Sequence, residues 1–167
     1  MSENNRVILQ DTSEKYATMV EKIVPPFLKL LDAIVELENA TFARSEEMEA
    51  EKVEMGLPRS QVHPDYMAFM ADYQKKYGEL VSGKCTKKLL DRPYGRSFRK
   101  PAKYEYVSEA QIFFTMKSAK KAVIVTEYQK GTNMKHRFVI KDEDGAWKID
   151  EIKYGFHDNN EWYIDQI

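Results

Sequence analysis

Several features that are common in proteins are scarce in this chain of 167 residues, and each scarcity excludes a class of protein. The single cysteine, Cys85, cannot form an internal disulfide and supplies too few thiolates for a structural zinc site. No run of about 18 apolar residues is present, so the sequence predicts no membrane-spanning helix. Residues 1–10 lack the basic start and the apolar run of a signal peptide. We therefore expect a soluble, cytoplasmic protein.

Glycine and histidine are also too few, or too scattered, to build familiar binding motifs. The seven glycines form neither the G-x-x-x-x-G-K-[ST] nor the G-x-G-x-x-G phosphate loop. The three histidines, His63, His136 and His157, lie far apart, and none has the spacing of the His-Glu-x-x-His zinc motif. The sequence therefore predicts neither a metal site nor any other cofactor, and it marks no residue as catalytic.

The formal charge of -1 conceals an uneven distribution along the chain. Residues 1–60 carry seven basic and twelve acidic residues, whereas residues 61–130 carry fourteen and seven. Residues 131–167 are acidic again, with five and eight. A charge pattern of this kind favours interaction with a specific partner over general coating of nucleic acid.

The basic excess is concentrated in Lys84–Lys103, which holds eight basic residues and one acidic residue. Tyr94, Phe98 and Tyr104 are interleaved with these charges, as in a groove that binds single-stranded nucleic acid. A basic loop that docks on the acidic helix of its own chain explains the segment at least as well. The acidic remainder of the chain disfavours a nucleic-acid partner.

Helical periodicity dominates the first half of the chain. Apolar residues recur at i, i+3, i+4 and i+7 from Tyr16 to Ile23, after a capping-box-like start at Asp11 and Glu14. Pro25 and Pro26 are expected to interrupt this helix, because proline lacks the N–H donor. A second apolar stripe runs through Phe27–Phe42 and stops by Gly56, and a third begins at Pro64.

Alternating β-branched and aromatic residues dominate the second half. They predict strands at 111–117, 122–129, 134–141 and 146–156, joined by short turns. The alternation changes parity in the last strand, which predicts a bulge near Asp150-Glu151. We favour a solvated role for these two carboxylates at a sheet edge.

Together the two halves predict an α+β fold, with N-terminal helices packed on a curved antiparallel sheet. We expect a single domain, 1–167. Within it, residues 1–10 are a candidate disordered segment, 11–83 are mainly helical, 104–156 form the antiparallel sheet, and 157–167 form a C-terminal segment.

Three segments carry a resemblance to a known family: GAWKIDEIKY (145–154), DRPYGRSFRKPAKYEYV (91–107) and NNEWYIDQI (159–167). With the order of helices and strands, they resemble the nuclear transport factor 2-like superfamily, and most of all the immunity proteins of bacterial polymorphic toxin systems. The resemblance covers roughly Asp11–Ile167. It implies a cystatin-like cone with an internal pocket, and a non-enzymatic protein that binds a cognate toxin domain and neutralises it by occlusion.

The superfamily also includes isomerases and cyclases, so the resemblance leaves other functions open. One alternative is a small-molecule binding protein or enzyme that uses the cone pocket, with His136, Tyr73 and Tyr77 as pocket candidates. A lone histidine on an apolar strand face is, however, more often a hydrogen-bonded core residue. The other alternative is a partner-binding scaffold, and homodimerisation through the sheet stays open.

Two charged sets are candidates for contact with a toxin. The first is acidic and would suit a toxin that binds nucleic acid or another anion: Glu46, Glu47, Glu49, Glu51 and Glu54. The second would suit an acidic partner, or could brace the fold: Arg92, Tyr94, Arg96 and Arg99. The sequence does not choose between them.

Overall fold

The chain folds into two compact units in the computed structural model, which describes residues 6–92, 96–128 and 134–167. Unit 1 comprises the described residues of 1–29, 83–94 and 106–167, and unit 2 those of 30–82 and 95–105. The long helix α1 (Met19–Glu54) contributes to both units.

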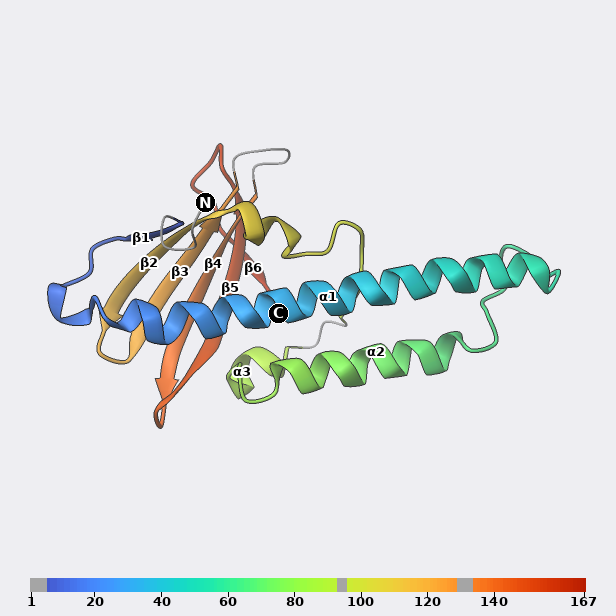
Figure 1. Cartoon of the computed structure of the whole chain (residues 1–167), viewed down its shortest axis with the longest axis horizontal. Helices are drawn as coiled ribbons and strands as arrows, with labels where there is room; N and C mark the ends of the chain where they lie inside the picture. Colours follow the sequence, from blue (N-terminus) through green and yellow to red (C-terminus); the bar gives the residue numbers. More distant parts are fainter. Residues whose placement is uncertain (1–5, 93–95, 129–133) are drawn as a thin grey trace. The chain divides into compact units, whose positions relative to one another are not determined.

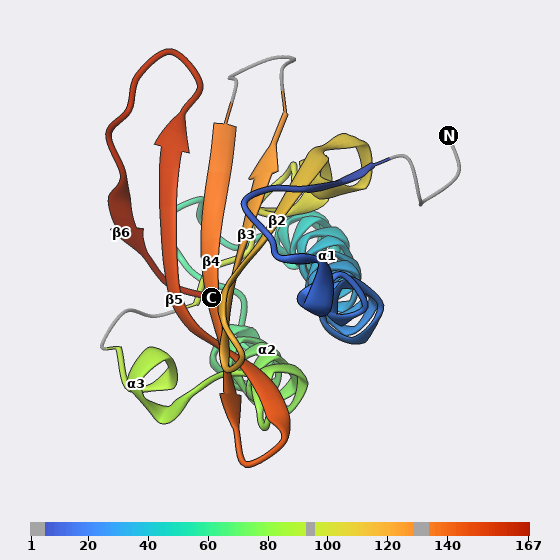
Figure 2. The same ribbon diagram turned by 90° about the vertical axis from the view of Figure 1, so that its left-hand side faces the viewer.

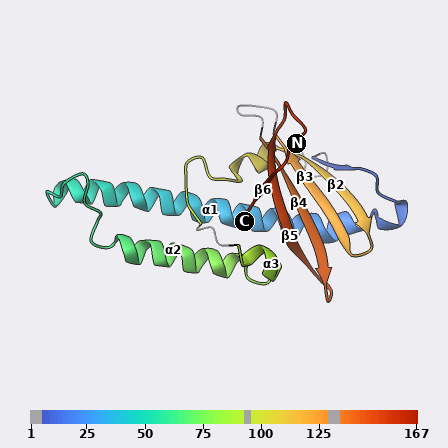
Figure 3. The same ribbon diagram turned by 180° about the vertical axis from the view of Figure 1, so that it is seen from behind.

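Unit 1 is built on a six-stranded sheet in which sequence order and spatial order coincide, as Figures 1 and 3 show. Its strands are β1 (Val7–Leu9), β2 (Gln111–Ser118), β3 (Lys121–Glu127), β4 (Met134–Glu143), β5 (Ala146–Phe156) and β6 (Tyr163–Asp165). From β2 to β6 every neighbouring pair is antiparallel. The four strands that alternation predicts are therefore present, and the α+β class is confirmed.

The first strand departs from the sequence-based expectation. Val7–Leu9 pairs in parallel with Ile112–Phe114 of β2, although residues 1–10 were a candidate disordered segment. Three residues are too few to show a period. β1 forms because its backbone pairs with the edge of β2, which lies more than a hundred residues later in the sequence. The sheet is consequently mixed rather than purely antiparallel.

The bulge predicted in the last long strand is present. Val139 pairs with Glu151 and Ile140 with Ile149, so Asp150 is the extra residue on β5. Because of this insertion, Ile149 and Ile152 are both buried, although they differ in parity.

The first turns of α1 lie over one face of the sheet, as Figures 1 and 2 show. Ile23, Val24 and Phe27 are buried there, and the ring of Phe27 packs edge-on against Phe138 of β4, with 4.7 Å between the ring centroids. Burial of such side chains stabilises by roughly 1.5–3 kcal/mol each, which exceeds the differences of up to about 0.7 kcal/mol in helix propensity among residues other than glycine and proline.

The expectation that Pro25 and Pro26 break the helix is wrong, because α1 continues through both prolines. Proline's fixed φ suits a helix, and its costs are a missing hydrogen bond and crowding against the preceding turn. Both prolines are exposed. In a regular helix the N–H groups of residues 25 and 26 would donate to the carbonyls of Glu21 and Lys22, which are exposed as well. Water can pair these carbonyls, while the buried residues on the opposite face hold the helix together.

Three short helices complete the description: η2 (Glu14–Tyr16), α3 (Lys87–Leu90) and η3 (Glu105–Glu109). Residues 84–86 join β5, since the Thr86 N–H donates to the Ile149 carbonyl and the Ile149 N–H to that of Lys84, each at 2.9 Å. The Thr86 side chain caps α3 and also donates to the Asp150 carboxylate at 2.9 Å.

Asp150 is therefore buried, at 5% exposure, and it forms ion pairs with Lys141 at 2.9 Å and Lys88 at 3.5 Å. The interpretation of this residue as a solvated carboxylate at a sheet edge is wrong. The bulge turns its side chain towards Thr86 and the lysines, a placement that strand alternation alone cannot reveal.

Unit 2 is a helical hairpin in which residues 30–54 of α1 lie beside the antiparallel α2 (Tyr66–Val81), as Figures 1 and 3 show. Gly56, with a φ of 70°, follows the end of α1, and Pro64 precedes α2. Residues 96–105 pack on α2: the Tyr73 hydroxyl donates to the Ser97 carbonyl at 2.9 Å, and Phe98 packs edge-on against Tyr73.

Candidate partner-binding surface

A groove of about 500 Å³ opens in unit 2, between the second half of α1 and the start of α2. Phe42, Glu46 and Glu49 line it from a single face of α1, since they follow the i, i+4, i+7 spacing of a helix. The full lining consists of Phe42, Ser45, Glu46, Met48, Glu49, His63, Tyr66 and Phe69. The groove thus combines aromatic walls with carboxylates.

Exposed apolar side chains are concentrated around the same end of the hairpin. Of the ten large apolar residues exposed in the described part of the chain, five fall between residues 53 and 67. They are Val53 (78% exposed), Met55 (54%), Val62 (59%), Tyr66 (38%) and Met67 (77%). We use the name hairpin surface for these five residues together with the eight residues that line the groove. Exposed apolar side chains gathered in this way are typical of protein interaction sites.

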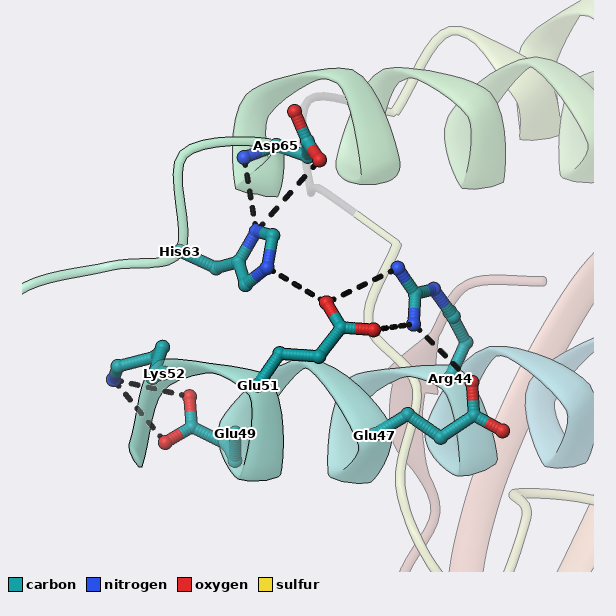
Figure 4. Close-up of polar contacts among 7 residues, drawn as sticks. All are labelled: Arg44, Glu47, Glu49, Glu51, Lys52, His63 and Asp65. Carbon is teal, nitrogen blue, oxygen red and sulfur yellow. Dashed lines mark hydrogen bonds and ion pairs between the residues drawn. The ribbon is translucent and has the colours of Figure 1, made fainter. Parts of the chain in front are cut away.

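A polar network connects α1 to the loop that precedes α2, as Figure 4 shows. The Arg44 guanidinium lies 2.7 Å from Glu51 and 3.2 Å from Glu47. The other oxygen of Glu51 lies 2.8 Å from Nε2 of His63, a residue that is only 4% exposed. Hydrogen bonds from Arg44 and then from His63 lower the pKa of the Glu51 carboxyl below its ordinary value.

The hydrogen bonds of His63 also define its tautomer. The backbone N–H of Asp65 donates to Nδ1 at 3.0 Å, so Nδ1 carries no proton. Nε2 is therefore the protonated nitrogen and donates to Glu51.

The five glutamates of the acidic candidate set consequently differ in what they do. Glu47 and Glu51 pair with Arg44, and Glu49 pairs with Lys52 at 3.1 Å. Glu46 and Glu54 have no ion pair within the described residues, and both are exposed. These two carboxylates are the charges of the set that a partner can use without breaking an existing ion pair.

The residues of the arginine set are distributed over both units, and two of the arginines make contacts within their own unit. In unit 1, Arg92 donates to the Asp165 carbonyl at 3.3 Å. In unit 2, the Arg96 guanidinium lies over the Tyr77 ring, 4.8 Å from its centroid. Arg99 is exposed, and Tyr94 lies outside the described residues. The contacts of Arg92 and Arg96 support the bracing role that the sequence left open.

The pocket candidates belong to different units of the chain. His136 belongs to unit 1, where it is 1% exposed and is hydrogen-bonded through Nδ1 to the Tyr106 hydroxyl. Its Nε2 lies 3.4 Å from the Asp165 carboxylate. Tyr73 and Tyr77 belong to unit 2, where their rings pack edge-on with centroids 5.8 Å apart. His136 thus has the contacts of a hydrogen-bonded core histidine.

Several residues of these sites were missed at the level of sequence. His63, Tyr66 and Phe69 line the groove, and Tyr106 is the partner of His136. The one available signal was the aromatic stripe of α2, which predicted a helix face rather than a groove. No sequence spacing connects His63 to Glu51 or Tyr106 to His136.

The described residues offer neither a metal cluster nor a membrane-spanning helix. No group of three or more His, Cys, Asp or Glu side chains in the described ranges is arranged to hold a metal ion. Among the same residues, no helix is both long and apolar enough to cross a membrane.

Comparison with known families agrees with the fold. The model of a family described as NTF2 fold immunity protein matches residues 36–166, which is more than half of the chain. The chain therefore belongs to the family of NTF2 fold immunity proteins, and the resemblance drawn from its sequence is confirmed. No curated protein and no solved structure matches the chain significantly.

Proposed function

We propose that this protein is the immunity protein of a bacterial polymorphic toxin system, and that it binds a cognate toxin domain in the cytoplasm and neutralises it by occlusion. Membership of the NTF2 fold immunity family supports this role, and we propose no catalytic activity of the chain's own. The observation that carries the mechanism is the hairpin surface, where exposed apolar side chains occur together with the carboxylates of Glu46 and Glu49.

The apolar residues of this surface supply the means to bind. Val53 and Met67 are more than three-quarters exposed, so a partner can remove most of their area from water. Apolar burial contributes roughly 25 cal/mol per Å², and a few well-packed anchors carry most of the affinity of an interface.

The carboxylates supply selectivity for the partner's charge. Glu46 lies in this surface and Glu54 follows its residue Val53, and complementary charge of such carboxylates accelerates encounter with a positive patch. Toxins that act on nucleic acid or on other anionic substrates need a positive patch at their active site. We therefore propose that the hairpin surface covers such a patch and thereby excludes the substrate.

Co-expression with the toxin encoded by the neighbouring gene tests this proposal. The wild-type chain should co-purify with the toxin domain and restore growth of cells that produce it. The double substitution Val53→Asp, Met67→Asp should weaken binding about tenfold or more and abolish protection, because each change places a charge in an apolar contact.

Ala40→Asp is the matched control, since Ala40 is an exposed residue of α1 outside the hairpin surface. This control should bind and protect like the wild type, and circular dichroism should show that all variants are folded. Absence of binding and protection by the wild-type chain would overturn the proposed function. Normal binding by the double variant would overturn the choice of surface.

A further inference from the structure

The walls of the groove are aromatic and held in place. Tyr66 and Phe69 lie with ring centroids 6.2 Å apart and an interplanar angle of 44°. Phe98 packs edge-on against Phe69, with centroids 5.7 Å apart, and so holds that ring from another side. Phe42 faces the groove from α1. A ligand therefore meets ring surfaces whose positions are set before it arrives.

The polar groups of the groove favour a cation. Glu46 has no ion pair within the described residues, and Glu49, whose side chain is 70% exposed, shares its charge only with Lys52. Both ring nitrogens of His63 are already engaged, Nε2 with the Glu51 carboxylate and Nδ1 with the Asp65 N–H. The ammonium of Lys100 lies 5.8 Å from the Phe42 ring centroid, within the distance range of a cation–π contact.

We propose that this groove receives an arginine side chain of the partner protein, and the proposal rests on the immunity function proposed above. The guanidinium would stack on the aromatic wall of Tyr66 and Phe69, and Glu46 and Glu49 would accept its hydrogen bonds. Arginine fits better than lysine, because its planar head stacks on rings and binds carboxylates in a bidentate manner.

The dimensions of the groove are compatible with this occupant. A volume of about 500 Å³ lies within the range of sites that hold small molecules, so it accommodates a whole arginine side chain with part of its backbone. The surrounding apolar residues of the hairpin surface, such as Val53 and Val62, then contact the flanking residues of the toxin. The groove thus becomes the anchor point of the wider interface.

A first experiment tests the groove without any toxin. N-acetyl-arginine amide is titrated into the full-length ¹⁵N-labelled protein at constant ionic strength, and amide shifts are followed by NMR. N-acetyl-citrulline amide is the control, since it has nearly the same shape but no charge. We expect saturable shifts at Phe42, Glu46, Tyr66 and Phe69 with the arginine compound, and shifts several-fold smaller with citrulline.

The carboxylate contribution is tested in the same titration. Glu46→Gln combined with Glu49→Gln should weaken the arginine compound about tenfold, because the charged acceptors are lost. Glu36→Gln, an exposed change elsewhere on α1, should leave its binding unchanged. Equal shifts with the two compounds, shifts outside the groove, or no shifts at all would overturn the proposal.

A second experiment separates this inference from the proposed function. Tyr66→Ala should weaken binding of the cognate toxin domain about tenfold. When one arginine of a semisynthetic toxin domain is replaced by citrulline, the wild type and Tyr66→Ala should bind that toxin with equal affinity. If the wild type neither binds nor protects against the toxin, the immunity function fails, whatever the arginine compound does. If the wild type protects but Tyr66→Ala binds equally well, only the arginine anchor fails.

Discussion

The carboxylate of Glu51 lies 2.8 Å from Nε2 of His63, and this contact joins α1 to the loop that leads into α2. The two residues are twelve positions apart, and the histidine is buried although its partner is partly exposed. With Asp65 bonded to the other ring nitrogen, His63 satisfies both of its polar atoms within the hairpin. The contact therefore holds the loop that frames the proposed binding groove.

Removal of this imidazole should destabilise unit 2. We expect His63→Ala to lower the free energy of unfolding by about 1–3 kcal/mol, because two partly buried hydrogen bonds and the packing of the buried ring are lost. Urea denaturation measures the change. His157→Ala, a substitution of an exposed histidine, is the control and should stay within about 0.5 kcal/mol of the wild type. Equal stability of the two variants would contradict a structural role for His63.

The stabilising effect of Glu51 should depend on pH. Arg44 and His63 lower its pKa in the folded protein, so its stabilisation is fully present above the ordinary carboxyl value of 4.5. It is lost as the pH falls through the lower pKa of the folded state. The difference in unfolding free energy between the wild type and Glu51→Gln should accordingly be largest near neutral pH and shrink in acid.

Urea denaturation between neutral and acidic pH measures this difference. Glu54→Gln, on the same helix but without an ion pair in the described part of the chain, should differ little from the wild type at any pH. A constant difference for Glu51→Gln across the acid range would show that the pairing with Arg44 and His63 does not depend on its charge.

The bulge residue Asp150 should be a second stability determinant, in unit 1. Burial alone would raise its pKa, but the hydrogen bonds from Lys141 and Thr86 outweigh this and lower it. Asp150→Asn should reduce the unfolding free energy by about 1–3 kcal/mol at neutral pH. The loss should diminish in acid, as the wild-type carboxyl is protonated. Asp158→Asn, an exposed change, is the matched control.

The two prolines of α1 should limit its stability. Replacement of Pro25 or Pro26 by alanine restores a backbone donor and removes crowding, so each change should raise the unfolding free energy by about 1–3 kcal/mol. Both side chains are exposed, so no packing is lost. Thermal and urea unfolding would show the gain. Destabilisation by either substitution would mean that the prolines set a helix geometry that unit 1 needs.

Much of the fold follows from local patterns. Alternation located β2 to β5, and the change of parity located the bulge, because side chains on a strand alternate strictly between the two faces. Propensity failed at Pro25 and Pro26, where buried neighbours outweigh the cost of proline. It also missed β1, since a three-residue strand is defined by its partner rather than by its own sequence.

The candidate site was only half visible in the sequence. The glutamate run was found, but not that Glu47, Glu49 and Glu51 have ion pairs whereas Glu46 and Glu54 have none with any described residue. That distinction depends on where side chains of α1, the loop and α2 meet. The groove itself requires two helices to lie side by side, and no window along a single helix contains that information.

The sequence by itself determined the class of fold and, through its resemblance, the family of immunity proteins. Both follow from the periodicity and composition of consecutive residues, which can be read without knowing how distant segments pack. The tertiary structure alone decided that His63 pairs with Glu51, that Asp150 is buried against Thr86, and that aromatic rings and carboxylates share one groove. These contacts join residues from different elements, and only burial and hydrogen bonding between those elements select them.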